Sequence, residues 1–286
     1  MDIRVRHQLA VDIGNTIHSI TWPSSYQEPD YVAKLVSTLP AEIKKSLLSL
    51  LPGRTIKVGG AFIHQKPLAK FILPPYAGMK SPELGDLLVI CREQRASGNV
   101  YDALLLQAKC TSNVFRTTVP YDHQFILYSQ WPAFEYVRAG HLNGIQRSVS
   151  PKTITQGAQY LLIDKNSPSE MFTATVDIPL EGTTCLPCAL ASVLAFDRGR
   201  TFTKNTRDNW SNVIWDLLNI SCSAVFNRRR AGYNNEPRLS GDSAFHFLLS
   251  QDDDNEIPVM KGRDDEGKPT GFGVICVDLG ASGSQL

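Results

Sequence analysis

The sequence predicts an α/β protein with a mixed central sheet flanked by helices. Three observations predict this class: a helical pattern lies near the start, several short apolar strand-like runs follow it, and further strand-like and helical patterns come after them. The 286 residues are 42% hydrophobic and 20% charged. This is the composition of a packed soluble protein, and it excludes a disordered, fibrous or coiled-coil chain.

The first predicted helix spans residues 31–51, where Asp30 can cap it and Pro40 is expected to split it in two. Short apolar runs that are bounded by turn residues predict the strands. A later helical pattern is interrupted at Trp131-Pro132. In this part of the chain the predicted strands are 55–62, 68–73, 87–91, 103–106, 159–163 and 172–178, and the later helix is 124–137.

The last part of the chain has a more helical pattern. Residues 187–196 and 210–226 are predicted helices, and residues 273–279 are a predicted last strand. The segments 227–242 and 251–271 are rich in polar residues, which indicates loops. We therefore expect residues 1–180 to form the core and residues 181–286 to form a mostly helical C-terminal elaboration, either separate or part of the same domain.

Charge is balanced over the whole chain but not along it. The 29 lysine and arginine residues against 28 aspartate and glutamate residues leave a net charge of +1, which gives no sign of a polyanionic partner. Residues 251–286 carry eight acids and three bases, a net charge of −5, so residues 1–250 carry +6. Any nucleic-acid-binding face must therefore be local.

The cysteine content and the absence of long apolar stretches both predict a cytoplasmic protein. Six cysteines are too sparse at this length for a disulfide-stapled secreted scaffold, so we interpret them as thiols in a reducing compartment. No stretch reaches the roughly 18 apolar residues of a membrane span, and no leader pattern is present at the start. We expect no membrane partner.

Polar side chains are concentrated at one end of two apolar strand-like runs. Asp86 begins the first run, whereas Gln107 and Lys109 end the second, and a turn-like segment around Ser97 separates the runs. A hairpin centred on Ser97 places Asp86 opposite Ala108, on the other face from the two side chains. A shift of the centre by half a residue places Asp86 on their face, and the sequence leaves both registers open.

Such a group has the chemistry needed for phosphodiester hydrolysis. Mg²⁺ prefers oxygen ligands, which Asp86, Gln107 and the carbonyl of Ala108 can supply, while it keeps several waters. A bound ion activates water and neutralises phosphate charge, and Lys109 can orient that water or stabilise the transition state. The alternative interpretation is that these are ordinary polar residues at strand ends.

Asp86, the hydrophobic strand, the turn and Leu-Leu-Leu-Gln107-Ala108-Lys109 resemble the PD-(D/E)XK nuclease superfamily. The resemblance covers roughly residues 31–140. It implies that Asp86 binds metal, that Gln107 binds metal directly or through water, and that Lys109 is catalytic. The sequence departs from the motif at two positions. Gln107 replaces the acid that the superfamily more often has, and Gly85, directly before Asp86, replaces the proline of the motif.

Further acids join the site in some members, from the helix before the strands. The resemblance makes Glu42 and the nearby Glu83 candidates, with Glu83 as an additional metal ligand. It implies a restriction-endonuclease-like core and a Mg²⁺-dependent DNA endonuclease, with Mn²⁺ as a substitute ion. It also implies a place in bacterial restriction or anti-phage defence, as a homo-oligomer or as a subunit of a defence complex. The alternative function is a non-catalytic nucleic-acid-binding or assembly subunit that retains the fold.

The run Arg228-Arg229-Arg230 is the candidate nucleic-acid-binding segment, because arginines at a helix end can contact phosphates. The equally weighted alternative is a solvated run that is favourable to the helix dipole.

Cys185-Leu-Pro-Cys188 has the spacing of a zinc half-site or a redox pair. Cys222 and His246 are the distant residues that would have to complete a zinc site. We predict instead buried structural cysteines at a helix start.

Segments 11–16 and 277–283 resemble the phosphate loop of actin-like ATPases, but no partner loop is found in mid-chain, so we predict ordinary strand and turn segments there.

Overall fold

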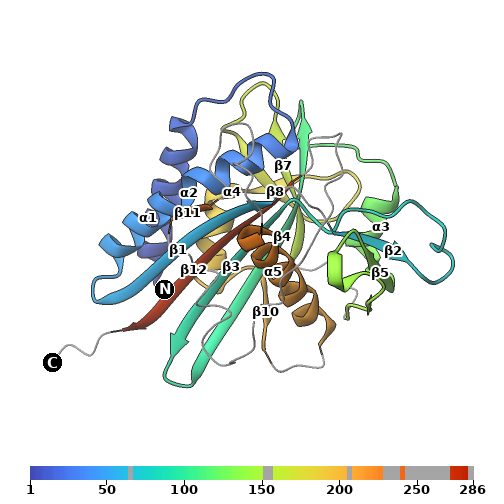
Figure 1. Ribbon diagram of the computed structural model, residues 1–286. Coiled ribbons are helices and arrows are strands. Elements are labelled where there is room, and N and C mark those ends of the chain that lie inside the picture. Colours follow the sequence, from blue (N-terminus) through green and yellow to red (C-terminus); the bar gives the residue numbers. More distant parts are fainter. Residues whose placement is uncertain (64–66, 151–156, 205–207, 228–238, 242–270, 283–286) are drawn as a thin grey trace.

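The protein is an α/β protein whose mixed central sheet is flanked by helices (Figure 1). The computed structural model describes residues 1–63, 67–150, 157–204, 208–227, 239–241 and 271–282. Within them, a nine-stranded sheet has the order β11-β1-β12-β3-β4-β7-β8-β9, with β10 paired to β4, and a smaller sheet has the order β2-β5-β6. No helix in these ranges is both long enough and apolar enough to cross a lipid bilayer.

The helices are α1 (Ile3–Ser19), α2 (Glu28–Leu50), α3 (His123–Gln130), α4 (Leu186–Leu194) and α5 (Asn209–Asn227), with a short 3₁₀ helix at Gly140–Leu142. The strands of the central sheet are β1 (Arg54–Ile63), β3 (Leu87–Arg95), β4 (Gly98–Thr111), β7 (Ala158–Asp164), β8 (Met171–Ala174), β9 (Gly182–Cys185), β10 (Arg200–Phe202), β11 (Leu239–Gly241) and β12 (Phe272–Ser282). The smaller sheet contains β2 (Leu68–Phe71), β5 (Phe134–Val137) and β6 (Gln146–Arg147).

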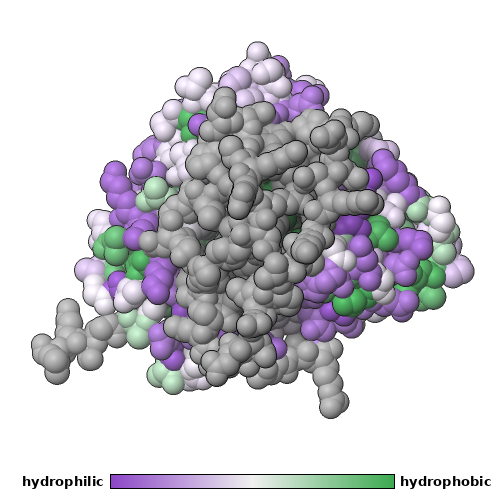
Figure 2. All heavy atoms as spheres, in the orientation of Figure 1, coloured by the Kyte–Doolittle hydropathy of each residue, from purple (hydrophilic) through white to green (hydrophobic). Residues whose placement is uncertain are grey.

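Two hydrophobic cores lie on opposite faces of the central sheet. One core is formed with α1, α2 and α4, and the other with α3, α5 and the smaller sheet. Along β4, successive side chains alternate between the cores, with Leu104 and Leu106 in the first and Leu105 in the second. Figure 1 shows α1 and α2 side by side at the left and the smaller sheet beside α3 at the right. Figure 2 shows small apolar patches among hydrophilic residues on the visible coloured surface.

Helix α1 contradicts the predicted strand and turn at residues 11–16. Asp2 caps the helix by accepting the N–H groups of Arg4 and Val5. Leu9, Ile13 and Ile17 recur every four residues and are buried against the neighbouring helices. The segment therefore packs as one face of an amphipathic helix, and it forms no phosphate loop.

Helix α2 is continuous through Pro40, so the predicted split is wrong. It begins at Glu28, because Gln27 is its N-cap and the Asp30 carboxylate accepts the Gln27 N–H at 2.7 Å. Its buried face packs on β1 and β12. Gly60 of β1 allows this approach, since a Cβ there would lie 3.0 Å from Pro40 Cγ. Packing against the sheet thus stabilises the helix where proline removes a hydrogen bond.

The C-terminal part of the chain contributes strands as well as helices to the fold. The described residues after 181 contain α4 and α5, but β12 lies between β1 and β3 in the middle of the sheet. It pairs antiparallel to β1 and parallel to β3. The expectation of a mostly helical elaboration is therefore incomplete, because this strand belongs to the same sheet as residues 1–180. The segment 277–283, which resembled a phosphate loop in sequence, belongs to β12 as far as residue 282.

Candidate active site

The register of the β3–β4 hairpin brings Asp86, directly before β3, beside Gln107 of β4, and the two side chains are hydrogen-bonded. Leu87 pairs with Leu106, and the turn is centred between Ala96 and Ser97, half a residue from the first expected position. Because Gln107 Nε2 donates to the Asp86 carboxylate, the two side chains meet on one face of the sheet. Lys109, two residues further along β4, projects from that face as well. The register thus decides the question that the sequence left open.

The Asp86 carboxylate is held by β4. Gln107 Nε2 and the Ala108 N–H at 2.7 Å both donate to Asp86 Oδ2. The Asp86 backbone is fixed on both sides, because its N–H donates to the Leu106 carbonyl and its carbonyl accepts the Gly273 N–H, each at 2.8 Å. The carboxylate is therefore preorganised between β3, β4 and β12.

Gln107 carries the unsatisfied acceptor of the group. Asp86 is 1% exposed and Gln107 is 3% exposed, and Gln107 Oε1 is buried without a hydrogen-bond partner among the described residues. Burying an unpaired acceptor costs about 1–3 kcal/mol, so such an atom calls for an explanation, for which a bound cation or water is suitable.

The oxygen atoms that the side chains offer at this position are suitable ligands for a hard divalent cation. A carboxylate and an amide carbonyl are oxygen ligands, and Mg²⁺ is commonly held by one or two carboxylates with waters and substrate phosphates in its other positions. Asp86 and Gln107 are the residues that would hold the ion. Within the described ranges, no group of three or more His, Cys, Asp or Glu side chains is arranged to hold a metal, so the protein ligands here would be few.

Ala108 contributes to the site through its backbone. Its side chain lies in the core on the opposite face, and its N–H binds Asp86. The residue pairs with Leu161 in the parallel β4–β7 ladder. The expectation that its carbonyl is a metal ligand stays a prediction.

Several charged side chains lie near the end of β4, and their charges shift the pKa of the Cys110 thiol. The pKa of the Cys110 thiol is raised to about 12, mainly by partial burial and then by the charges of Glu28 and Asp86, and Lys165 and Lys109 offset part of this rise. Lys109 itself is half-buried and pairs with Leu162 of β7. Acids and ammonium groups therefore meet at the strand end where the sequence placed the site.

Glu28 is the helix acid that lies near this strand end, and it was not among the acids predicted from the sequence. Its Oε1 accepts the Cys110 N–H at 3.1 Å. The expected acid, Glu42, lies fourteen residues further along α2, which corresponds to roughly 21 Å of helix. The Gln27 and Asp30 capping pair was the signal available in the sequence, since it starts the helix early enough to include Glu28.

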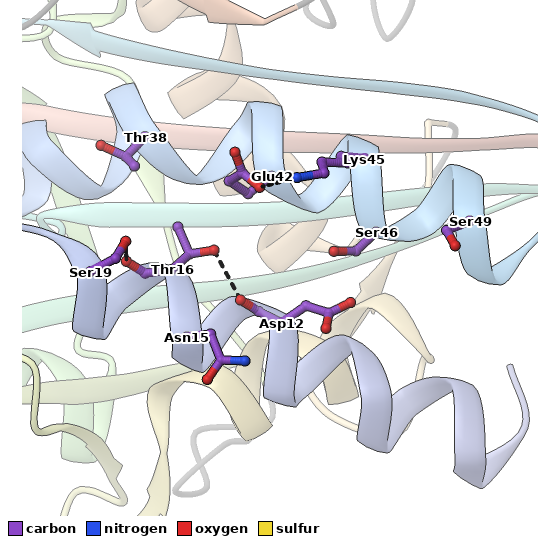
Figure 3. Close-up of a pocket in the computed structure, with 9 residues that line it drawn as sticks. All are labelled: Asp12, Asn15, Thr16, Ser19, Thr38, Glu42, Lys45, Ser46 and Ser49. Atoms are coloured by element: carbon purple, nitrogen blue, oxygen red, sulfur yellow. Dashed lines mark hydrogen bonds and ion pairs between the residues drawn. The ribbon is translucent and has the colours of Figure 1, made fainter.

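Glu42 instead lines a polar groove between α1 and α2, with a volume of about 540 Å³. Figure 3 shows Glu42 next to Lys45 on α2, with Asp12 on α1 across the groove. The Glu42 carboxylate lies 3.7 Å from the Lys45 ammonium. Helices α1 and α2 cover the face opposite to Asp86 and Gln107, so the structure does not bring Glu42 to the candidate site.

Glu83 is half-buried beside the site. Its carbonyl accepts Gln124 Nε2 at 3.1 Å, and its charge acts on Tyr128. Burial, followed by the charge of Asp86, raises the pKa of Tyr128 well above its ordinary value. Tyr128 is therefore protonated and donates to the Leu84 carbonyl at 2.9 Å, which fixes α3 over this end of the sheet.

Some predicted residues lie outside the described part of the chain. Arg228, Arg229, Arg230 and His246 are among them, and the side chain of Cys222 in α5 is not described.

Comparison with protein-family models, curated proteins and solved structures found no match to this chain.

Proposed function

We propose that this chain is a Mg²⁺-dependent nuclease with a restriction-endonuclease-like core that hydrolyses DNA phosphodiester bonds. One observation carries the proposal: Asp86 and Gln107 are paired across the β3–β4 hairpin, and Lys109 follows on the same face. The order of α2, the hairpin and α3 agrees with the resemblance over residues 31–140. DNA as the partner, an endonuclease mode, and bacterial restriction or anti-phage defence in the cytoplasm belong to the same proposal.

Each residue has a chemical task in this function. Asp86 and Gln107 would hold the cation through oxygen atoms, and the ion, when bound, supplies an activated water and neutralises phosphate charge. The ammonium of Lys109 would orient the attacking water or stabilise negative charge on the phosphate. Because Gln107 is neutral, the site has one negative charge fewer than one with an acid there, and its metal affinity should be correspondingly low.

The burial of the site favours a second candidate function. A phosphate has to reach Asp86 and Gln107, yet both are almost inaccessible in this conformation. A non-catalytic nucleic-acid-binding or assembly subunit, either in a homo-oligomer or in a defence complex, needs no such access. Nuclease activity requires the side chains over the sheet end to move when substrate binds.

A cleavage assay on plasmid and linear DNA in Mg²⁺, Mn²⁺, Ca²⁺ and EDTA tests the proposal. Asp86→Asn and Lys109→Met are expected to lower the rate roughly 10²–10⁴-fold, the usual contribution of a positioned catalytic group. Lys70→Met is the matched control, since its exposed ammonium pairs with Glu135. Gln107→Glu restores a carboxylate and should lower the Mg²⁺ concentration needed for half-maximal cleavage.

The outcomes separate the two functions. Activity that persists in both Asp86→Asn and Lys109→Met contradicts this site. DNA binding without cleavage in any of these metals supports the non-catalytic subunit instead. If the folded protein neither binds nor cleaves DNA, both candidate functions are contradicted.

A further inference from the structure

The Cys185-Leu-Pro-Cys188 segment lies at a junction between the sheet and a helix. Cys185 ends β9, where it pairs with Phe172 of β8, and it is also the N-cap residue of α4. Cys188 follows in the first turn of that helix. Pro187 packs against α1, since a Cβ built on Gly14 would lie 3.6 Å from Pro187 Cγ. Both cysteines therefore have positions fixed by packed elements.

Cys185 at the N-cap and Cys188 three residues later share the first turn of α4, a spacing that puts two side chains on one side of a helix. Among the five cysteines whose side chains the structure describes, Cys188 is the exposed one, and Cys185 is half-buried. The predicted helix start is confirmed, but the predicted burial is wrong, because the first turn of α4 reaches the surface at Cys188. A dithiol within one helical turn and open to solvent at Cys188 can react with small thiol reagents.

A structural zinc site is a weaker explanation of this pair. Such sites almost always have four protein ligands. Within the described ranges, no third His, Cys, Asp or Glu side chain joins the pair in a metal-binding group. Two thiols alone are sufficient for redox chemistry, which needs only a partner disulfide.

We propose that Cys185 and Cys188 form a dithiol–disulfide site that exchanges with low-molecular-weight disulfides of the glutathione type. The thiolate of Cys185 attacks one sulfur of the small disulfide, which forms a mixed disulfide and releases one small thiol. Cys188 then loses its proton and attacks the Cys185 sulfur, which releases the second small thiol. The two cysteines are oxidised to one disulfide, the small disulfide is reduced to two thiols, and the two protons leave with those thiols.

The local electrostatics support Cys185 as the attacking sulfur. Burial of part of the side chain, followed by the hydrogen bond and the charge of Cys185, raises the pKa of Cys188 to about 11. Cys188 therefore keeps its proton at neutral pH, and this leaves Cys185 as the sulfur that attacks first. The N-terminus of α4 favours negative charge on the sulfur at its N-cap.

Differential alkylation of the full chain in glutathione buffers tests the proposal. Samples at increasing oxidised fraction are acid-quenched, denatured and treated with a maleimide, and the peptide that contains both cysteines is weighed by mass spectrometry. Its two thiols should disappear together, its mass should fall by two hydrogens, and dithiothreitol should restore both thiols. This wild-type experiment needs no variant and is independent of nuclease activity, although it uses the same preparation.

Variants locate the chemistry. Cys188→Ser should trap one glutathione on Cys185, whereas Cys110→Ser, which removes a half-buried thiol elsewhere, should leave the internal disulfide unchanged. The proposal is overturned if both cysteines of folded wild-type protein stay open to alkylation in the most oxidising buffer. It is also overturned if glutathione adds without an internal disulfide, or if stoichiometric zinc protects the pair.

Discussion

Asp102 is the residue that we expect to govern the pH dependence of folding. It lies on β4, is 2% exposed and accepts the Ala103 N–H at 3.1 Å. Burial raises the pKa of its carboxyl to about 7, an effect that the Ala103 hydrogen bond partly offsets. The folded protein therefore binds a proton more tightly than the unfolded chain does, and this stabilises it at low pH.

Stability should accordingly fall as the pH rises from about 4 to about 7, by up to about 1.4 kcal/mol per pH unit from this group. Asp102→Asn removes the titrating group, so urea unfolding between pH 4.5 and 8 should give a flatter profile than that of the wild type. Asp177→Asn, at an exposed position, is the control and should keep the wild-type slope. Equal slopes for the wild type and Asp102→Asn would rule out the assignment.

The candidate site shows how far single residues can be predicted. Asp86, Gln107 and Lys109 could be selected as candidates from the sequence because polar residues at the ends of apolar strands stand out, and their roles stay predictions. Glu28 was missed because its approach to Cys110 depends on where α2 packs. Side-chain types are local information, whereas convergence of residues far apart in sequence is not.

At the scale of elements, a buried ion pair joins β3 to β12. Arg92 Nε and Nη2 donate to the two carboxylate oxygens of Asp278, each at 2.7 Å, and both side chains are 3% exposed. Asp278→Ala would leave the guanidinium charge buried without this carboxylate. Removing one member of such a pair typically costs 3–5 kcal/mol, so we expect a loss of about that size in the free energy of unfolding.

Urea denaturation measures this loss. The matched control is Lys70→Ala, because the pair of Lys70 with Glu135 is exposed on its lysine side and should contribute no more than about 1 kcal/mol. A similar, small effect of both substitutions would show that Arg92 is rehydrated or paired elsewhere in the variant.

Elements were predicted well where their pattern was local. The hairpin strands, α2 and β12 occur close to their predicted positions, but β4 is longer than predicted, at Gly98–Thr111, because the turn between the strands is only two residues long. Residues 11–16 also fit a strand and turn pattern, and the burial of Leu9, Ile13 and Ile17 against the neighbouring helices decides for α1 instead. Tertiary packing also overrode the helix-breaking tendency of Pro40.

At the scale of the whole molecule, β12 ties the end of the chain to its beginning. The strand lies between β1 and β3, and its Val274, Ile275 and Val277 are buried on both faces of the sheet. A chain of residues 1–180 would lack this strand and would expose an apolar gap between β1 and β3. We therefore expect that it does not fold alone, although the predicted core boundary falls at residue 180.

Circular dichroism and thermal unfolding of three chains test this expectation. Residues 1–180 and 1–270 should give no cooperative transition, because both lack β12, whereas residues 1–282 should unfold cooperatively. A cooperative transition for residues 1–180 would establish an independent N-terminal domain and contradict the prediction.

The sequence by itself determined the fold class, the apolar strands and the residue types gathered at one end of the hairpin, because these depend on composition and on short-range periodicity. Only the tertiary structure decided that Asp86 is hydrogen-bonded to Gln107, that Glu28 approaches β4, and that β12 enters the middle of the sheet. A half-residue difference in the position of a turn changes the face of every side chain in a strand. Pairing between distant segments is fixed by the burial of both faces of the sheet, which no local pattern encodes.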